Sequence, residues 1–163
     1  MIKDSFRFKG VFHVRCIGPD GQVKWEDKAP NMVVNQGIQH VLDLTFTGAA
    51  IQVDPWYIGL CNASPEPAAG HTLTDISEFT DYADNRKEWV EVRADQSLSN
   101  TASKASFAIN ENASSIGGAF LCSVATTTTG VLMSYSAFTG GNKSADSGDT
   151  LEVTYTLSGA DAG

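Results

Sequence analysis

The sequence predicts a mainly β domain, an antiparallel sandwich or barrel of about eight strands with one short helix. Three observations support this fold class. Several segments alternate apolar and polar residues with a period of two, which is typical of strands with one buried face. Turn sequences rich in Gly, Pro and Asp separate these segments. Only residues 35–46 have apolar side chains at helical spacing, so no helices alternate with the strands.

The first two strands are expected at residues 6–16 and from Val23 onward. Between them stands Pro19-Asp20-Gly21, in which Gly supplies the positive φ that a hairpin turn needs. Within each strand the apolar residues share one parity, and in the first strand the polar residues share the other. The apolar positions are Phe6, Phe8, Phe12, Val14, Cys16, Val23 and Trp25, and the polar positions of the first strand include Arg7, Lys9, His13 and Arg15.

The single helix is predicted at about residues 35–46. Asn35 stands where an N-terminal cap belongs, and Gly48 stands where a C-terminal stop belongs. Because the helix is short, we expect it to cover one end or one face of the sheets. Its apolar face consists of Ile38, Val41, Leu42 and Phe46.

The rest of the chain contains further predicted strands and one long predicted loop. Gly117 and Gly118 are followed directly by apolar residues, which favours close backbone packing in a strand over a phosphate-binding loop. Residues 62–86 contain prolines and an acidic stretch, and they are predicted as the longest loop. The further strands are expected at residues 56–60, 89–93, 105–109, 116–124, 131–138 and 151–157.

The length of 163 residues fits one domain, large enough to bury roughly 70% of its unfolded surface. We expect an N-terminal arm at residues 1–8, a single sandwich domain at residues 9–158 and a flexible tail at residues 159–163. No internal repeat or linker divides the chain.

Charge and cysteine content narrow the function classes. The net charge of −8 and an isoelectric point near 4.7 disfavour nucleic acid and anionic membranes as main partners. We find no apolar region typical of a signal peptide and no apolar run long enough to span a membrane. Cys16, Cys61 and Cys122 have neither metal-binding nor redox spacing, so they are predicted as free, mostly buried thiols of a protein made in a reducing compartment.

Signals for catalysis are weak, and we expect no catalytic residue, no metal and no cofactor. The histidines have no partner at metal-ligand spacing, and no serine stands in a G-x-S-x-G motif. An acidic loop leaves open a glycoside hydrolase with paired carboxylates, although a solvated loop is the simpler interpretation and the calcium-loop pattern is absent. The acidic residues are Asp75, Glu78, Asp81 and Asp84.

Three tryptophans admit a second binding hypothesis. Trp25, Trp56 and Trp89 all stand in strand contexts, where core packing is the simpler interpretation. An exposed platform of these rings would instead indicate a carbohydrate-binding module. Their exposure distinguishes the two hypotheses.

Four segments, in this order, resemble small virion structural proteins of tailed bacteriophages. The first follows an "N-x-V-V-x-x-G-hydrophobic" pattern at the entry to the helix, and the second is a Trp-Tyr-hydrophobic-Gly-Leu strand. The resemblance covers most of residues 6–157 and is greatest to capsid decoration (cement) proteins. Because its motifs are structural, it carries over no catalytic residue. The segments are Asn31–Asp43, Trp56–Leu60, Gly118–Leu121 and Gly148–Leu157.

The resemblance implies a non-enzymatic β-sandwich of jelly-roll type that binds the outer surface of a phage capsid and clamps neighbouring capsomers. The implied partners are the major capsid protein and other copies of the chain, as a dimer or trimer. Such a protein is made in the bacterial host cytoplasm and resides on the capsid exterior of the virion. The alternatives are a small tail-associated protein and a carbohydrate-binding or host-attachment module of the virion.

Two segments are candidate contact surfaces for the capsid. In the arm, aromatic anchors are expected to add a strand to an exposed sheet edge, with basic residues paired to acidic groups. In the loop at 62–86, two aromatic residues are expected as apolar anchors on a neighbouring subunit. The alternative is that both segments only close the sandwich. The candidate residues are Lys3, Phe6, Arg7 and Phe8 in the arm, and Phe79 and Tyr82 in the loop.

Overall fold

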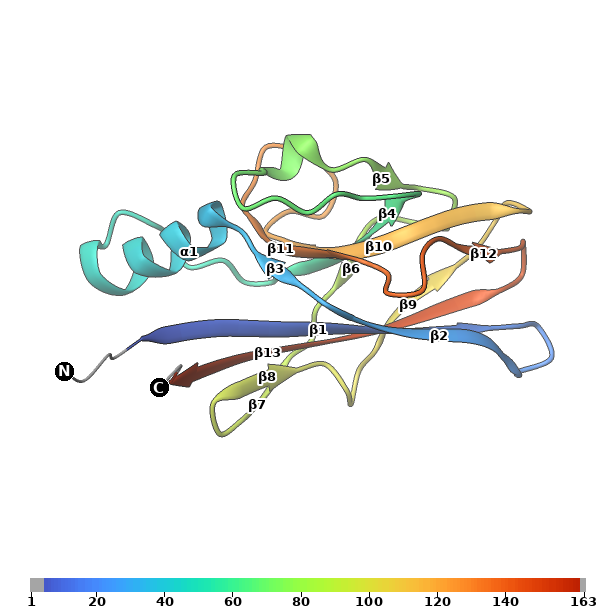
Figure 1. The fold of residues 1–163 in the computed structure, drawn as a ribbon, viewed down its shortest axis with the longest axis horizontal. Coiled ribbons are helices and arrows are strands. Elements are labelled where there is room, and N and C mark those ends of the chain that lie inside the picture. The colour runs from blue at the N-terminus through green and yellow to red at the C-terminus, as the bar shows by residue number, and fades with distance from the viewer. Residues whose placement is uncertain (1–4, 162–163) are drawn as a thin grey trace.

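The computed structural model describes residues 5–161, which form two facing antiparallel β-sheets and one helix at one end of the sandwich (Figure 1). This arrangement confirms the mainly β fold class, the antiparallel sheets and the single helix. The facing sides of the two sheets meet in one apolar core, and a second buried cluster, which includes Leu73, Phe120 and Tyr135, lies on the other side of the second sheet.

The first sheet has six strands in the order β2-β1-β13-β8-β7, with β9 also paired to β13. Its two long central strands, β1 and β13, pair along their whole length from Phe6↔Asp161 to Ile17↔Thr150. The strands are β1 (Phe6–Ile17), β2 (Val23–Pro30), β7 (Val92–Ala94), β8 (Ser97–Ser99), β9 (Ala105–Ala108) and β13 (Thr150–Asp161).

The second sheet has seven strands in the order β3-β11-β10-β4-β5, with β12 also paired to β10 and β6 to β4. Gly118 in β10 allows close approach to the next strand, since a Cβ there would lie 1.9 Å from the Ser136 carbonyl oxygen. The strands are β3 (Met32–Val33), β4 (Tyr57–Asn62), β5 (Glu78–Phe79), β6 (Lys87–Glu88), β10 (Ser114–Cys122), β11 (Leu132–Ala137) and β12 (Lys143–Ala145).

The core confirms the predicted period-two alternation in β1 and β13. Phe12, Val14 and Cys16 of β1 are fully buried, while the residues between them face outward. The ring of Phe12 stacks on that of Tyr155 with 4.2 Å between centroids, and the Trp89 indole donates a hydrogen bond of 3.1 Å to the Tyr155 carbonyl. All three cysteines are free and buried, as predicted.

The predicted helix is present, with a change of pitch near its end. α1 (Asn35–Leu42) continues as the π-helical turn η1 (Asp43–Thr47) and stops at Gly48, whose φ of +66° fits the expected stop signal. Asn35 is not the cap, since the cap position is Val34 and no side chain caps the helix. Gly37 fixes the helix against β11, because a Cβ there would lie 2.6 Å from the Met133 carbonyl oxygen.

The number of strands is higher than predicted. The structure has thirteen strands, not about eight, because β3, β5, β6, β7, β8 and β12 are only two or three residues long and too short for a periodic pattern. The prediction of a single strand at residues 89–93 is wrong. The chain instead forms β6 in one sheet and β7 in the other, with Trp89 buried between them.

The expected arm, loop and tail all differ from the prediction where they are described. Residues 6–8 belong to β1 and residues 159–161 to β13, so both segments lie in the central antiparallel strand pair of the first sheet. Residues 1–4, which include Lys3, lie outside the described residues. The 62–86 segment contains β5 and the 3-10 helix η2 (Leu73–Asp75), and it covers the second sheet.

Candidate interaction surface

An apolar groove of about 740 Å³ opens at the end of the sandwich where α1 and the start of β1 lie (Figure 1). Phe6, Arg7 and Phe8 of β1 form one wall, and α1 and η1 form the other. We call this cavity the end groove. Its remaining lining residues are Val33, Ile38, Val41, Leu42, Thr45 and Phe46.

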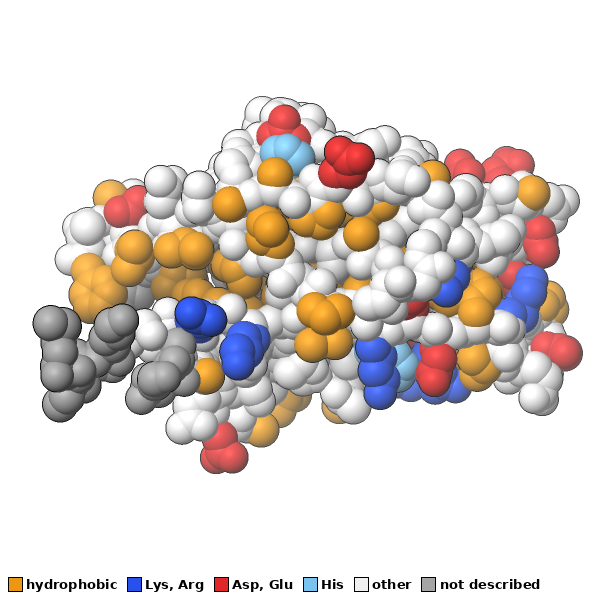
Figure 2. All heavy atoms as spheres, viewed as in Figure 1, with side chains coloured by type: hydrophobic (Ala, Val, Ile, Leu, Met, Phe, Trp, Pro, Cys, Tyr) orange, Lys and Arg blue, Asp and Glu red, His pale blue; other side chains and the backbone are white. Residues whose placement is uncertain are grey.

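Two residues that line the end groove are among the most exposed apolar side chains of the described chain. Phe46 is 78% exposed and Phe6 is 66% exposed. Figure 2 shows hydrophobic side chains gathered over α1 and beside the start of β1. Contiguous apolar surface of this kind marks a binding site more often than a free surface, because leaving it in water is unfavourable.

A smaller recess of about 360 Å³ continues the end groove inward, since Phe8 and Val41 line both. Its floor includes Trp56, and the His40 ring packs edge-on against this indole at 5.6 Å between centroids. The His40 Nε2 atom is buried without a hydrogen-bond partner among the described residues. The recess is therefore lined mainly by apolar residues, together with the polar residues His40, Gln52, Asp54 and Glu91.

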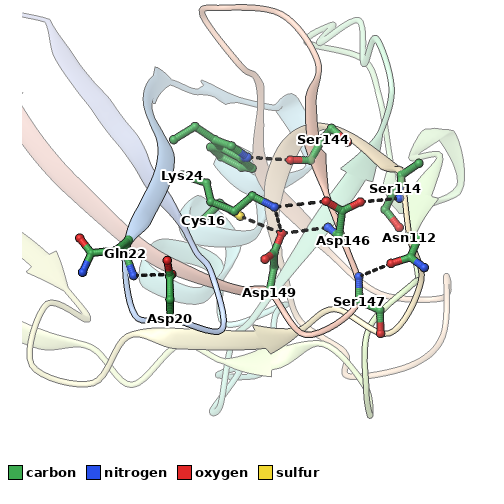
Figure 3. Close-up of polar contacts among 12 residues, drawn as sticks. Cys16, Asp20, Gln22, Lys24, Asn112, Ser114, Ser144, Asp146, Ser147 and Asp149 are labelled. Carbon is green, nitrogen blue, oxygen red and sulfur yellow. Dashed lines mark hydrogen bonds and ion pairs between the residues drawn. The ribbon is translucent and has the colours of Figure 1, made fainter.

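The opposite end of the sandwich is closed by polar contacts (Figure 3). Lys24 in β2 lies 2.7 Å from the Asp149 carboxylate and 3.2 Å from that of Asp146. The Asp149 carboxylate also accepts a hydrogen bond of 2.9 Å from the Asp146 amide and a longer one from the Cys16 thiol. These contacts tie the β1–β2 hairpin to the turn before β13, so the cluster has a structural use.

The pKa values at this polar cluster follow from its contacts. Burial by itself raises the pKa of Asp149, but the Lys24 ammonium group and the Asp146 amide outweigh it and lower that pKa below the ordinary value. Burial, followed by the nearby Asp149 charge, raises the pKa of the Cys16 thiol to about 12. Cys16 is therefore a poor nucleophile at neutral pH.

The four carboxylates of the hydrolase alternative each serve a separate local contact. Glu78 binds Arg86, whose guanidinium donates bonds of 2.8 and 2.6 Å to it. Since each carboxylate has its own structural partner, the contacts favour a loop-fixing role over a shared catalytic site. The other pairs are Asp75 with the Thr72 amide and hydroxyl, Asp81 with the Ser114 hydroxyl, and Asp84 with Lys87.

The three tryptophans do not form a platform. Trp89 is 3% exposed in the core, whereas Trp25 and Trp56 are half-buried. Trp25 packs against Phe138 and donates a hydrogen bond of 2.8 Å to the Ser144 carbonyl, near the polar end of the sandwich. Trp56 lies in the recess beside the end groove. The rings therefore belong to different parts of the molecule.

The structure separates the predicted contact residues into two groups. Phe6, Arg7 and Phe8 lie together at the end groove, which leaves them available for contact. Phe79 and Tyr82 are 1% and 6% exposed and belong to the core, so their expected role as surface anchors is wrong. They are buried because β5 is itself a strand of the second sheet: Phe79 lies beside Leu60 and faces the core between the sheets, and Tyr82 packs edge-on against Phe107 of β9.

The helix side of the end groove was missed as a contact surface. Ile38, Leu42 and Phe46 form the expected apolar face, and this periodicity is the same whether a neighbouring element covers the face or not. The sequence therefore carries no signal that this face is left open.

Comparison of the chain with protein-family models, curated proteins and solved structures finds no match. Within residues 5–161, no cluster of three His, Cys, Asp or Glu side chains is placed to hold a metal ion. Neither α1 nor any other helix of the described chain has the length and apolar character needed to cross a membrane. The end groove is therefore the feature on which a function can be argued.

Proposed function

We propose that this chain is a non-enzymatic virion structural protein that binds the outer surface of a bacteriophage capsid and clamps neighbouring capsomers. The observation that carries this proposal is the end groove with its exposed apolar rim. The resemblance of the sequence to capsid decoration proteins supplies the setting. A small tail-associated protein would use the same surface in a different part of the virion.

The end groove suits a macromolecular partner. Burying an apolar side chain such as Phe46 at an interface stabilises the complex by roughly 25 cal/mol per Å² of apolar area. The Phe46 side chain is more than three-quarters exposed, so most of this gain is still available to a partner. The groove lies between β1 and α1, and its volume of about 740 Å³ can take an extended segment or an aromatic anchor.

A clamp of this kind stabilises a shell by linkage. A protein that binds only the intact lattice shifts the equilibrium away from disassembly, because separation of capsomers requires its release. Many copies, self-associated as dimers or trimers around local symmetry axes, would act together through avidity, so no single contact has to be tight.

We also propose that the sandwich is of jelly-roll type. In its support, the chain passes between the two facing sheets at β2–β3, β6–β7, β9–β10 and β12–β13. The first and last long strands, β1 and β13, are neighbours in one sheet. The hairpin of β10 and β11 places two consecutive strands side by side within the other sheet.

The capsid proposal is tested by cosedimentation of the purified chain with expanded capsids of the parent phage that lack it. We expect saturable binding, which Phe46→Ser weakens at least tenfold. The matched control is Val23→Ser, which also removes an exposed apolar side chain but lies at the opposite end of the sandwich. Decorated capsids should also survive heating better than bare ones.

Two results would overturn the proposal. One is the absence of binding to capsids at micromolar protein concentration. The other is binding to isolated tails alone, which would assign the chain to the tail. Equal effects of the two serine variants on capsid binding would remove the end groove from the contact while leaving the capsid as partner.

A further inference from the structure

We propose that the start of β1 is a strand-addition site for an extended partner segment in which apolar and acidic residues alternate. This assignment deepens the proposed function and rests on it only for the identity of the partner, which would be the major capsid protein. The juxtaposition behind it is an open strand edge, an apolar groove on one face of that edge and a pair of cations on the other.

The edge of β1 is open at its N-terminal end. β13 pairs with all of β1, from Phe6 to Ile17, but β2 pairs only with Val11 onward. Beyond Pro30 the chain leaves for β3 in the other sheet. Residues 6–9 therefore have a strand on one side and, among residues 5–161, none on the other.

The backbone groups of Phe6 and Phe8 point to this open edge. The backbone N–H of Asn31 donates a hydrogen bond of 3.0 Å to the backbone carbonyl of Gly10. The backbone N–H and C=O groups of Gly10 therefore face away from β13. In a strand, residues two apart direct their N–H and C=O groups to the same edge. Phe6 and Phe8 thus offer two donors and two acceptors to an added strand.

The inner face of the open edge selects apolar residues. Phe6 and Phe8 share the parity of the buried Phe12, and both line the end groove. Their rings contact each other edge-to-face at 5.0 Å between centroids. Alternate side chains of an added strand would enter the groove between these rings and Phe46 of η1.

The outer face of the open edge selects acidic residues. Arg7 and Lys9, which alternate with Phe6 and Phe8 along the strand, are exposed, although Arg7 is also among the residues that line the end groove. Their cross-strand neighbours in β13, Ala160 and Ser158, carry no charge. Neither cation takes part in an ion pair among the side chains that the structure describes. A carboxylate opposite each cation would add a favourable cross-strand pair on the added side.

The same cations disfavour a second copy of the chain as the added strand. In an antiparallel pairing that keeps both apolar faces on one side, Arg7 and Lys9 would oppose Arg7 and Lys9 of the other copy. Like charges directly opposite each other destabilise a sheet. A partner with carboxylates at these positions has the complementary pattern.

The test uses labelled peptides of alternating Val and Glu, with a Val/Lys peptide of equal length as the control, in fluorescence anisotropy titrations of the full chain. We expect the Glu peptide to bind at least tenfold more tightly. This preference is diagnostic because the net charge of −8 would favour the Lys peptide in the absence of a local site. The double variant Arg7→Glu/Lys9→Glu should reverse the preference.

A matched pair of variants tests the backbone contribution. Phe6→Pro and Phe6→Ala both remove the ring, but only proline removes the donor at the open edge. Proline is tolerated at the first residue of a strand, and this N–H does not face β13, so both variants should fold alike by circular dichroism. We expect Phe6→Pro to bind the Glu peptide at least fivefold more weakly than Phe6→Ala.

Four results would overturn the strand-addition site. They are failure of both peptides to bind, equal or tighter binding of the Lys peptide, equal affinities of the two Phe6 variants, and a dimer in sedimentation that Phe6→Pro dissociates. The last result would make a second copy the occupant. Selective peptide binding without capsid binding would reject the capsid as partner and leave the strand-addition site in place. Capsid binding that the double variant Arg7→Glu/Lys9→Glu leaves unchanged would reject the strand-addition site and leave the capsid as partner.

Discussion

The Lys24 ammonium group lies 2.7 Å from the Asp149 carboxylate and joins two turns that are 125 residues apart in the chain. The Asp149 side chain is 2% exposed, so its charge depends on the contacts around it. The Cys16 thiol and the Asp146 amide also direct hydrogens toward this carboxylate. These contacts hold together the end of the sandwich that lies opposite the apolar end groove. Because they depend on the charge of Asp149, they also make the stability of the protein sensitive to acid.

Replacement of Asp149 by Asn is expected to destabilise the protein at pH 7 by about 1–3 kcal/mol, because a charge-assisted network loses its acceptor. The folded-state pKa of Asp149 lies below its ordinary value. Its stabilising contribution is thus present above the ordinary pKa near 4 and is lost as pH falls through the lowered one. Urea unfolding from pH 6 to pH 3 should show a smaller loss of stability in Asp149→Asn than in the wild type.

Asp84→Asn is the control for this pH series. Asp84 is 84% exposed and pairs only with Lys87, so its replacement should change the free energy of unfolding by no more than about 0.5 kcal/mol. An Asp149→Asn protein with the pH profile of the wild type would contradict the assigned role of the Lys24–Asp149 pair.

Replacement of Arg86 by Met is expected to destabilise the chain by about 3 kcal/mol, because it leaves Glu78 unpaired in a partly buried position. The Arg86 guanidinium also donates to the Val124 and Thr127 carbonyls, and it lies 5.2 Å from the centre of the Phe120 ring. The double variant Arg86→Met/Glu78→Gln should recover part of the loss. A double-mutant cycle in urea measures this coupling, and strict additivity of the two losses would contradict it.

Gly118→Ala is expected to destabilise the protein by at least roughly 2 kcal/mol, because the new Cβ would meet the Ser136 carbonyl at 1.9 Å in a tightly paired sheet. Gly70→Ala is the control, since no atom lies within 4 Å of a Cβ built there. We expect Gly70→Ala to leave the thermal midpoint unchanged or to raise stability by up to about 1 kcal/mol. Equal midpoints for the two variants would show that β10 and β11 can separate without cost.

The three thiols are expected to be unreactive in the native protein. Cys16, Cys61 and Cys122 are each no more than 1% exposed, and burial raises the pKa of all three. A disulfide reagent at pH 8 should therefore titrate three thiols only in urea, at a rate that follows unfolding. Rapid reaction of one thiol in the native state would reveal local opening at that cysteine.

The positions of the long strands were largely predictable, because residue periodicity and turn sequences within each segment determine them. The Pro19-Asp20-Gly21 turn forms as expected, with a φ of +81° at Gly21, and it fixes the register of β1 against β2. Gly118 indicated close backbone packing, and the structure places the Ser136 carbonyl against it. The short strands were not predictable, because two or three residues cannot show a period and pair only where a longer neighbour lies beside them.

The candidate site was predictable only in part. The apolar character of Phe6 and Phe8 follows from the sequence, but so does that of Phe79 and Tyr82. Alternation identifies which side of a strand is apolar and does not indicate what covers that side. The second pair faces the core between the two sheets and is buried there, whereas Phe6 of the first pair lies beyond the cover of the second sheet and is exposed.

By itself the sequence determined the sandwich class, the main hairpin, the single helix and the free buried thiols, since these depend on local periodicity, turn geometry and cysteine spacing. Only the tertiary structure decided which part of each apolar face is covered by another element and which part stays exposed. The second sheet does not extend over the start of β1, so Phe6 remains exposed while Phe12, on the same face of the same strand, is buried. The end groove arises from this difference in length between two layers, which depends on contacts between residues far apart in the chain.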